Sequence, residues 1–231
     1  GGQGIPLVDA TADSERFRVE HYVCGFRMSM FERQSIGNRI LSLMDLRVNA
    51  CRTAQGQRMN GVVWGGSPGG LPGVLTHPWI PKRIGSVNWA TAAIDTVIED
   101  VGALVHYAAD NTHDAGQTTK VVVASKLSRV LQVRRVTSTG LNLWSYIKAV
   151  FPQVQFVEAH SLNGKGPNGE HGVLGYNGAD PFSAMHDLVQ PLTFLAPQTR
   201  EFDDLVFCYS TTGGFKAFNA HHDILQFVPA S

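Results

Sequence analysis

Three residues near the carboxyl end of the chain have the side chains of a hydrolytic triad. Ser210 offers a nucleophile, His222 a general base and Asp223 an acid that would orient the base. Hydrolases with this triad commonly present the serine on a strained turn with the pattern Gly-x-Ser-x-Gly, and that pattern does not surround Ser210. Because this pattern is missing, the sequence predicts no catalytic residue. An α/β hydrolase is kept only as the enzymatic alternative.

The histidines do not form a metal-binding pattern. His221 and His222 are adjacent, so in a strand they would point to opposite faces and could not bind one ion together. His106 and His113, the latter followed by Asp114, fall near a predicted helix end, where exposed polar histidines are common. We expect no metal and no other cofactor.

Two glycine-rich segments resemble nucleotide-binding loops in composition only. Residues 164–169 satisfy Gly-x-Gly-x-x-Gly, but Pro167, Asn168 and Gly172 favour a loop where a dinucleotide site needs a helix to begin. Residues 65–73 lack the Gly-Lys-Ser/Thr ending of a phosphate-binding loop. The sequence therefore predicts no nucleotide site.

The three cysteines are Cys24, Cys51 and Cys208. Disulfide frameworks and zinc clusters usually show paired, short spacings, and these cysteines are few and far apart in the sequence. We therefore expect buried free thiols in a reducing compartment.

Composition and charge narrow the class of protein further. The chain has 231 residues, of which 43% are hydrophobic, and 24 are glycines, which suits a loop-rich globular protein with a real core. The formal net charge is zero, which argues against a dedicated nucleic-acid binder. No segment approaches the roughly 20 apolar residues that span a bilayer, so we expect no membrane contact.

The charges are unevenly distributed along the chain. Residues 115–157 contain six cations and no acid, whereas residues 158–231 contain eight acids and three cations. This asymmetry predicts one basic and one acidic face.

The first half of the chain predicts a ribbon followed by two long helices. Residues 17–30 are β-rich and read as an extended ribbon that needs a partner to be stable. Residues 34–58 have helical apolar spacing and predict an amphipathic helix about 35 Å long. Asn88 is a plausible N-cap for a second helix, whose apolar residues from Ile94 to Val105 recur at intervals of three and four.

The second half mixes strands and shorter helices, so the fold class is α+β. The pattern predicts strands at residues 121–124 and 154–158, and helices at 126–133 and 141–150. Residues 205–210 and 215–218, separated by a turn at 211–214, predict a hairpin, and residues 223–228 predict a last strand.

An ordered turn rich in glycine and proline, residues 65–81, separates the two long helices. Together with this order of elements, its residues Gly73, Leu75, His77 and Pro78 resemble the major capsid proteins of tailed bacteriophages. In that family a turn similar to Gly-Leu-Leu-Asn-His-Pro follows the long helix, and Val74 and Thr76 depart from it. Encapsulin shell proteins share the same Hong Kong phage-type fold.

The resemblance implies a division of the chain and a function. Residues 1–33 would form the end of an amino-terminal arm and an extended loop, residues 34–81 a peripheral domain with a long spine helix, residues 82–198 an axial domain, and residues 199–231 strands that return to the peripheral domain. The chain would self-assemble into pentamers and hexamers that form an icosahedral shell around a phage genome. An encapsulin-type compartment is the alternative.

The same resemblance implies partners and a location. Portal, scaffold or decoration proteins would contact the shell, and packaged DNA would touch it without sequence preference. The protein would assemble in the host cytoplasm and become part of the virion. Because the family often loses an amino-terminal segment to a protease, a start at Gly1 is consistent with such cleavage.

Some residues are candidates for contacts between subunits. We expect the basic stretch from Lys120 to Lys148 to contact acids of an adjacent copy, such as Glu158, Glu201, Asp203 or Asp204. The candidates for these contacts are Arg16, Arg18, Glu20, Arg134 and Arg135.

His77 in the turn and the four tryptophans of the chain have simpler expected roles. We expect His77 to bond carbonyls of its own loop, in preference to acting as a ligand or switch. Trp64, Trp79, Trp89 and Trp144 are expected to be packing anchors.

Overall fold

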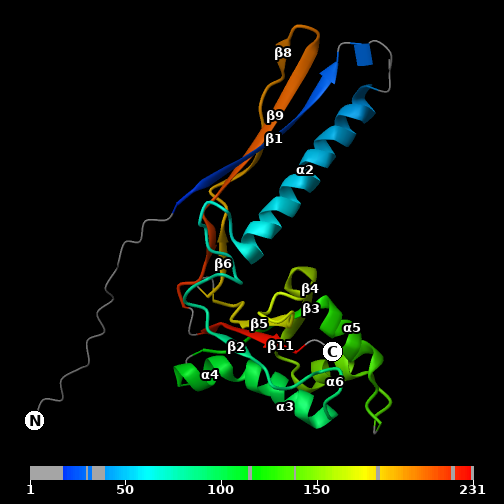
Figure 1. The fold of residues 1–231 in the computed structure, drawn as a ribbon, viewed down its shortest axis with the longest axis vertical. Helices are drawn as coiled ribbons and strands as arrows, with labels where there is room; N and C mark the ends of the chain where they lie inside the picture. The colour runs from blue at the N-terminus through cyan, green and yellow to red at the C-terminus, as the bar shows by residue number, and fades with distance from the viewer. Residues whose placement is uncertain are drawn as a thin grey trace, which may run out of the picture.

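The computed structural model describes residues 18–29, 31–32, 40–113, 116–137, 139–180, 183–219 and 222–229, with only the backbone for 40–42. The described chain has two parts: a compact body and a long arm that projects from it (Figure 1). The arm combines one long helix with a narrow sheet, and the chain passes between arm and body several times.

The body is built on a five-stranded sheet in the order β2-β11-β5-β3-β4. Its strands are β2 (Lys82–Ile84), β3 (Lys120–Ala124), β4 (Gln155–Ala159), β5 (His171–Tyr176) and β11 (Ile224–Val228). The β2–β11 and β3–β4 pairs are parallel, and the other two pairs are antiparallel. A sheet of mixed direction therefore joins segments from the middle of the chain to its last strand.

Helices pack around this sheet because their apolar faces need cover. These are α3 (Ile94–Val105), α4 (Tyr107–Thr112), α5 (Ser125–Val133) and α6 (Leu143–Val150), with a short 3-10 turn, η2 (His160–Leu162). In α3, Val97, Val101 and Leu104 recur at helical spacing and are buried. The N-terminus of α6 is capped by Asn142, whose Oδ1 accepts a hydrogen bond from the Ser145 N–H.

The arm has a sheet in the order β1-β9-β7, with β8 pairing the far end of β9. Its strands are β1 (Glu20–Ser29), β7 (Gln190–Phe194), β8 (Gln198–Arg200) and β9 (Asp203–Thr212). The helix α2 (Ile40–Gly65) runs along this sheet (Figure 1). The two-stranded pair of β6 (Met185–Asp187) and β10 (Gly214–Lys216) lies where the arm joins the body.

The long helix extends further than its pattern predicted. It continues to Gly65, seven residues past the predicted end at Arg58, and the predicted start at residues 34–39 lies outside the described residues. The added turns pack Val63 and Trp64 against the core of the body, which favours continuing the helix despite Gly56 and Gly61. Asn88 caps a short turn upstream of α3, where its Oδ1 accepts from the Ala90 N–H, and α3 itself follows Ala93.

The predicted hairpin at residues 205–218 is wrong. β9 runs through Thr212 and pairs with β1 and β7, whereas β10 pairs with β6. Gly214 has φ +82°, a conformation that favours glycine, and at this point the chain leaves the arm sheet instead of folding back on it. The glycines therefore redirect the strand, and local sequence alone did not reveal which partner each strand would take.

The strand pairing links segments on both sides of the expected boundaries. Within residues 82–198, β7 belongs to the arm sheet, and within residues 199–231, β11 belongs to the body sheet. Each of the two parts therefore draws strands from distant stretches of sequence. None of the described helices is long and apolar enough to cross a membrane.

Candidate functional site

The turn after α2 joins the arm to the body, and its backbone is tightly determined. The N–H groups of Val74 and Leu75 donate to the carbonyls of Val63 and Trp64, which continues the end of α2 into the turn. At Gly73 a Cβ atom would lie 2.2 Å from the backbone nitrogen of Gly66. Only glycine fits there without moving backbone atoms.

The other three residues of the resembling turn have distinct environments. Leu75 is half-buried against the core and lines a hollow of about 340 Å³ between α2 and η2, and Pro78 is exposed. His77 is buried, with its ring edge-on to Trp79 and Phe215 at centroid distances of 5.7 Å. The turn therefore fastens α2 to β10 through side chains as well as backbone.

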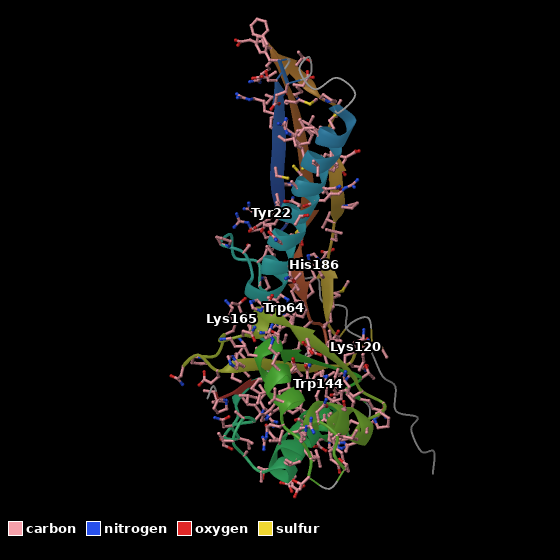
Figure 2. The ribbon with its side chains drawn as sticks, turned by 90° about the vertical axis from the view of Figure 1, so that its right-hand side faces the viewer. Tyr22, Trp64, Lys120, Trp144, Lys165 and His186 are labelled. Atoms are coloured by element: carbon pink, nitrogen blue, oxygen red, sulfur yellow. The ribbon has the colours of Figure 1, made fainter. Side chains whose placement is uncertain are left out.

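His77 does not bond the loop carbonyls, as the sequence led us to expect. Its Nδ1 accepts a 3.4 Å hydrogen bond from the Trp79 N–H, which places the ring proton on Nε2. Burial, with a smaller effect of Lys82, lowers the pKa of His77, so the ring is neutral at pH 7. Of the four tryptophans, Trp89 and Trp144 are buried as expected, Trp64 is half-buried at the base of α2 (Figure 2), and Trp79 is 52% exposed.

The arm is held together by polar contacts between α2 and both long strands. Gln55, buried on α2, donates from Nε2 to the Tyr22 carbonyl (2.9 Å) and to Ser210 Oγ (2.7 Å). The guanidinium of Arg58 lies 4.6 Å from the centre of the Tyr22 ring, and Figure 2 shows Tyr22 beside α2. Nearer the tip, Arg47 forms two hydrogen bonds with the Glu32 carboxylate.

The surface of the arm exposes large apolar side chains. Phe31 and Phe202 at its tip are 69% and 63% exposed, and their ring centroids are 6.3 Å apart. Val23 on β1 is 61% exposed. Within the described residues β1 pairs only with β9, so its outer edge has no strand partner. Exposed apolar groups beside an unpaired edge are typical of a surface that meets another chain.

The predicted contact residues near β1 already have partners within the subunit. Arg16 lies outside the described residues. Arg18 is exposed and donates to the Gly69 carbonyl at 2.8 Å. Glu20 accepts hydrogen bonds from Ser67 Oγ and Tyr22 Oη, which lower its pKa. These contacts tie the ribbon to the turn that follows α2.

The two arginines after α5 differ in their surroundings. Arg134 donates to the carbonyls of Trp89 and Ala92 and so fastens the segment before α3 to α5. Arg135 is exposed. Of the acids proposed to meet them, Glu158 accepts from Gln132, Asp203 lies 3.5 Å from Arg27, and Asp204 is buried and accepts from Thr199. Contacts of these residues between subunits stay a prediction.

A comparison with known families assigns the chain to a class. The sequence matches the major capsid protein family over residues 1–221, which is nearly its whole length. The chain is a member of the major capsid protein family. No curated protein matches it.

Solved structures of capsids and particles resemble this capsid subunit in fold. The capsid of Myoviridae Phage XM1 is similar, with a TM-score of 0.78, 14% identity, and 92% of this chain and 74% of that chain covered. The capsid of an empty GTA particle has a TM-score of 0.62 and 12% sequence identity, with 98% of this chain and 81% of that chain covered. A virus-like particle from Pyrococcus furiosus has a TM-score of 0.58 and 13% sequence identity, with 92% of this chain and 77% of that chain covered. The α+β fold predicted from the sequence is therefore confirmed as that of phage capsids.

A major capsid protein is a structural protein, not an enzyme. The structure does not bring Ser210, His222 and Asp223 together as a catalytic triad. Ser210 lies on β9 in the arm, where Gln55 is its partner. Asp223 lies next to β11 in the body and accepts from Ser183 Oγ at 2.5 Å. His222 Nδ1 lies 3.7 Å from a carboxylate oxygen of Asp180. His221 and Asp114 lie outside the described residues, and His113 ends α4 in a left-handed conformation, with φ 50°.

The loop at residues 164–169 is a loop in the structure, as predicted. Gly164 and Gly169 have φ +61° and +85°, and the chain then enters β5, not a helix. This part of the capsid subunit therefore lacks the helix N-terminus that would hold a phosphate group.

Cys51 and Cys208 are buried, as expected, and Cys24 is half-buried, but the sequence did not predict that the three thiols lie together. The Sγ atoms of Cys24, Cys51 and Cys208 all lie within 4.8 Å of one another, between β1, β9 and α2. Sequence spacing missed this cluster because it forms only when two distant strands and the helix pack together. The pattern could have indicated it only if residues 17–30 had been paired with residues 205–210.

Proposed function

We propose that the capsid subunit assembles into pentamers and hexamers that together close an icosahedral shell. Subunits arranged head to tail around a rotation axis form a ring, because each presents a different surface to its two neighbours. Many weak contacts of this kind make a stable shell through multivalency. The function thus lies in the surfaces that subunits present to one another.

The shape of the arm is the observation that carries this proposal. It projects away from the body, with exposed Val23, Phe31 and Phe202 and with the outer edge of β1 unpaired among the described residues (Figure 1). An arm with this surface gains most by lying across a neighbouring subunit, where its apolar side chains leave water. The internal contacts of Gln55 and Arg47 keep it straight enough to reach.

The domain roles follow from the same assignment. In this proposal residues 1–33 and 34–81 form the extended loop and peripheral domain. Residues 82–198, apart from β7 in the arm sheet, form the axial domain near the five-fold and six-fold axes, and residues 199–231 return through both sheets. Exposed Arg135 would meet acids of an adjacent copy, such as Glu201. Arg134 is the weaker candidate, because its guanidinium already supports the fold.

A phage genome is the proposed content of the shell. A subunit without net charge fits an inner wall that touches packed DNA without reading its sequence. Portal, scaffold and decoration proteins are the further partners that such a virion would need. The likeness to the virus-like particle from Pyrococcus furiosus supports a second candidate, a shell of encapsulin type that encloses a protein cargo.

Electron microscopy of the purified protein with light scattering for mass tests the assembly directly. We expect closed shells, or rings of five and six subunits. Nuclease-protected DNA inside the particles would support the genome, and a co-purifying enzyme would support the cargo compartment. If the protein gives only monomers or dimers, of about 25 to 50 kDa from the mass of the chain, the proposal is wrong.

A further inference from the structure

Three thiols from three different elements meet in the middle of the arm. Cys24 comes from β1, Cys208 from β9 and Cys51 from α2, and their sulfur atoms lie within 4.8 Å of one another. Cys51 and Cys208 are buried, and Cys24 is half-buried. Neither the fold nor the assembly described above requires three cysteines at this point.

Two of the thiols are placed as partners in the sheet. Cys24 and Cys208 are directly opposite each other in the antiparallel register of β1 and β9. Opposite residues in such a pair have Cα atoms about 4.5–5.5 Å apart, which overlaps the range that a disulfide spans. Their Sγ atoms are 2.8 Å apart.

The surroundings favour a neutral product over a charged one. Gly25, Phe26, Ala50 and Ala54 line a hollow of about 280 Å³ that also touches Cys24 and Cys51. Three thiolates around a divalent ion would leave one net negative charge in this mostly apolar place. Arg47 also lines the hollow, but its guanidinium is already bonded to Glu32. A disulfide carries no charge.

We propose that Cys24 and Cys208 are an oxidation site, at which a disulfide joins β1 to β9 once the protein leaves reducing conditions. Thiols stay reduced in a bacterial cytoplasm, whereas disulfides form and persist on virion surfaces. The bond would lock together two strands 184 residues apart in the sequence and so fix the arm in its extended form.

A small-molecule disulfide such as oxidised glutathione is the oxidant in this proposal. The thiolate of Cys24, which the hollow makes accessible, attacks one sulfur of the oxidant, forms a mixed disulfide and releases one thiol. Cys208 then gives up its proton and attacks Cys24 Sγ, which forms the protein disulfide and releases the second thiol. Two protein thiols are oxidised, and one glutathione disulfide is reduced to two thiols.

The order of attack follows from exposure. Burial raises the pKa of Cys208 to about 12, so little thiolate forms there to attack the oxidant first. Burial also raises the pKa of Cys51. Cys24 is therefore the entry point and Cys208 the resolving thiol, while Cys51 stays reduced.

Peptide mapping tests the pairing because trypsin separates the three cysteines. Cleavage after Arg18, Arg27, Arg200 and Lys216 puts Cys24 in residues 19–27 and Cys208 in residues 201–216, and Cys51 falls in residues 48–52. Purified protein is incubated overnight with oxidised glutathione or with a reductant, then alkylated under denaturing conditions, digested without reduction and analysed by mass spectrometry.

We expect peptides 19–27 and 201–216 to be linked in the oxidised sample and alkylated separately in the reduced one. The Cys51→Ser variant should keep the link, and Cys24→Ser and Cys208→Ser should lose it. Oxidation should also raise the apparent thermal midpoint by about 5–15 °C in the wild type and in Cys51→Ser, but not in Cys24→Ser or Cys208→Ser.

Other results would overturn the proposal. A dominant link that includes Cys51, a glutathione adduct on Cys24 that is never resolved, or three cysteines that remain fully alkylatable would each do so. A link that forms in unfolded protein as readily as in folded protein would also show that the register does not direct it.

Discussion

Gly73 has no side chain, and this allows the turn between arm and body to pack closely against the backbone of Gly66. We expect Gly73→Ala to destabilise the subunit by about 2–4 kcal/mol, because its Cβ would overlap the backbone of Gly66 and the last turn of α2. Chemical denaturation of the unassembled subunit, followed by circular dichroism, measures the change.

Gly56 provides a matched control within α2. A Cβ at Gly56 would have no atom within 4 Å, so Gly56→Ala should leave the turn intact and stabilise the helix by roughly 0.5–1 kcal/mol. Equal effects of the two substitutions would show that the close approach at Gly73 does not limit the fold.

Asp223 makes the stability of the body depend on pH. Burial raises its pKa from 3.8 to about 7, although the hydrogen bond from Ser183 opposes this shift. Because the folded state holds the proton more tightly, the carboxyl group favours folding at low pH, and this advantage is lost as pH rises from about 4 through 7. We expect the wild type to lose about 2–3 kcal/mol relative to Asp223→Asn between pH 5 and pH 8.

Denaturation of both proteins at several pH values measures this difference, and other titrating groups cancel in the comparison. Asparagine keeps an oxygen that accepts from Ser183, so the variant should fold. A constant difference between wild type and variant across the range would mean that Asp223 is ionised in the folded protein throughout.

At the scale of elements, Gln55 determines how α2 sits on the arm sheet. Its Nε2 group bonds a carbonyl on β1 and a hydroxyl on β9 at once. We expect Gln55→Ala to cost about 1–3 kcal/mol, since both acceptors are left unpaired in a buried place. Thermal denaturation of the subunit and protease digestion of the arm are the measurements.

Gln57, two residues further along α2, is exposed and serves as the control. Gln57→Ala should change stability by less than about 0.5 kcal/mol. If the two variants behave alike, the polar contacts of Gln55 do not hold the helix in place.

The elements also show what the sequence could and could not predict. The strand β3 and the helices α5 and α6 were predicted to within about two residues, because their patterns of burial are local. The partners of β9 and β10 were not, because pairing depends on residues far away in the chain. The same limit hid the meeting of Cys24, Cys51 and Cys208, which no spacing rule reveals.

For the whole molecule, the decisive property is how much apolar surface the arm leaves without cover. On one side of the arm, α2 and the sheet pack against each other. At the tip, the rings of Phe31 and Phe202 remain exposed. A single subunit gains nothing from such a tip. A neighbour that covers it would turn each exposed ring into a contribution to assembly.

Phe202 therefore allows the assembly function to be separated from the fold. We expect Phe202→Asp to fold like the wild type, since the ring is 63% exposed, but to reduce the yield of closed shells more than about tenfold. The charge would have to be buried without a partner wherever the tip meets a neighbouring subunit. Circular dichroism of the subunit and sedimentation of the particles report the two properties independently.

Phe202→Leu is the matched control, because leucine keeps an apolar side chain at the same place and should retain assembly. Wild-type yields from Phe202→Asp, with normal particles by electron microscopy, would show that the tip stays in water in the shell. The arm would then bind its neighbour through the edge of β1 and Val23, and Val23→Asp would become the variant that prevents assembly.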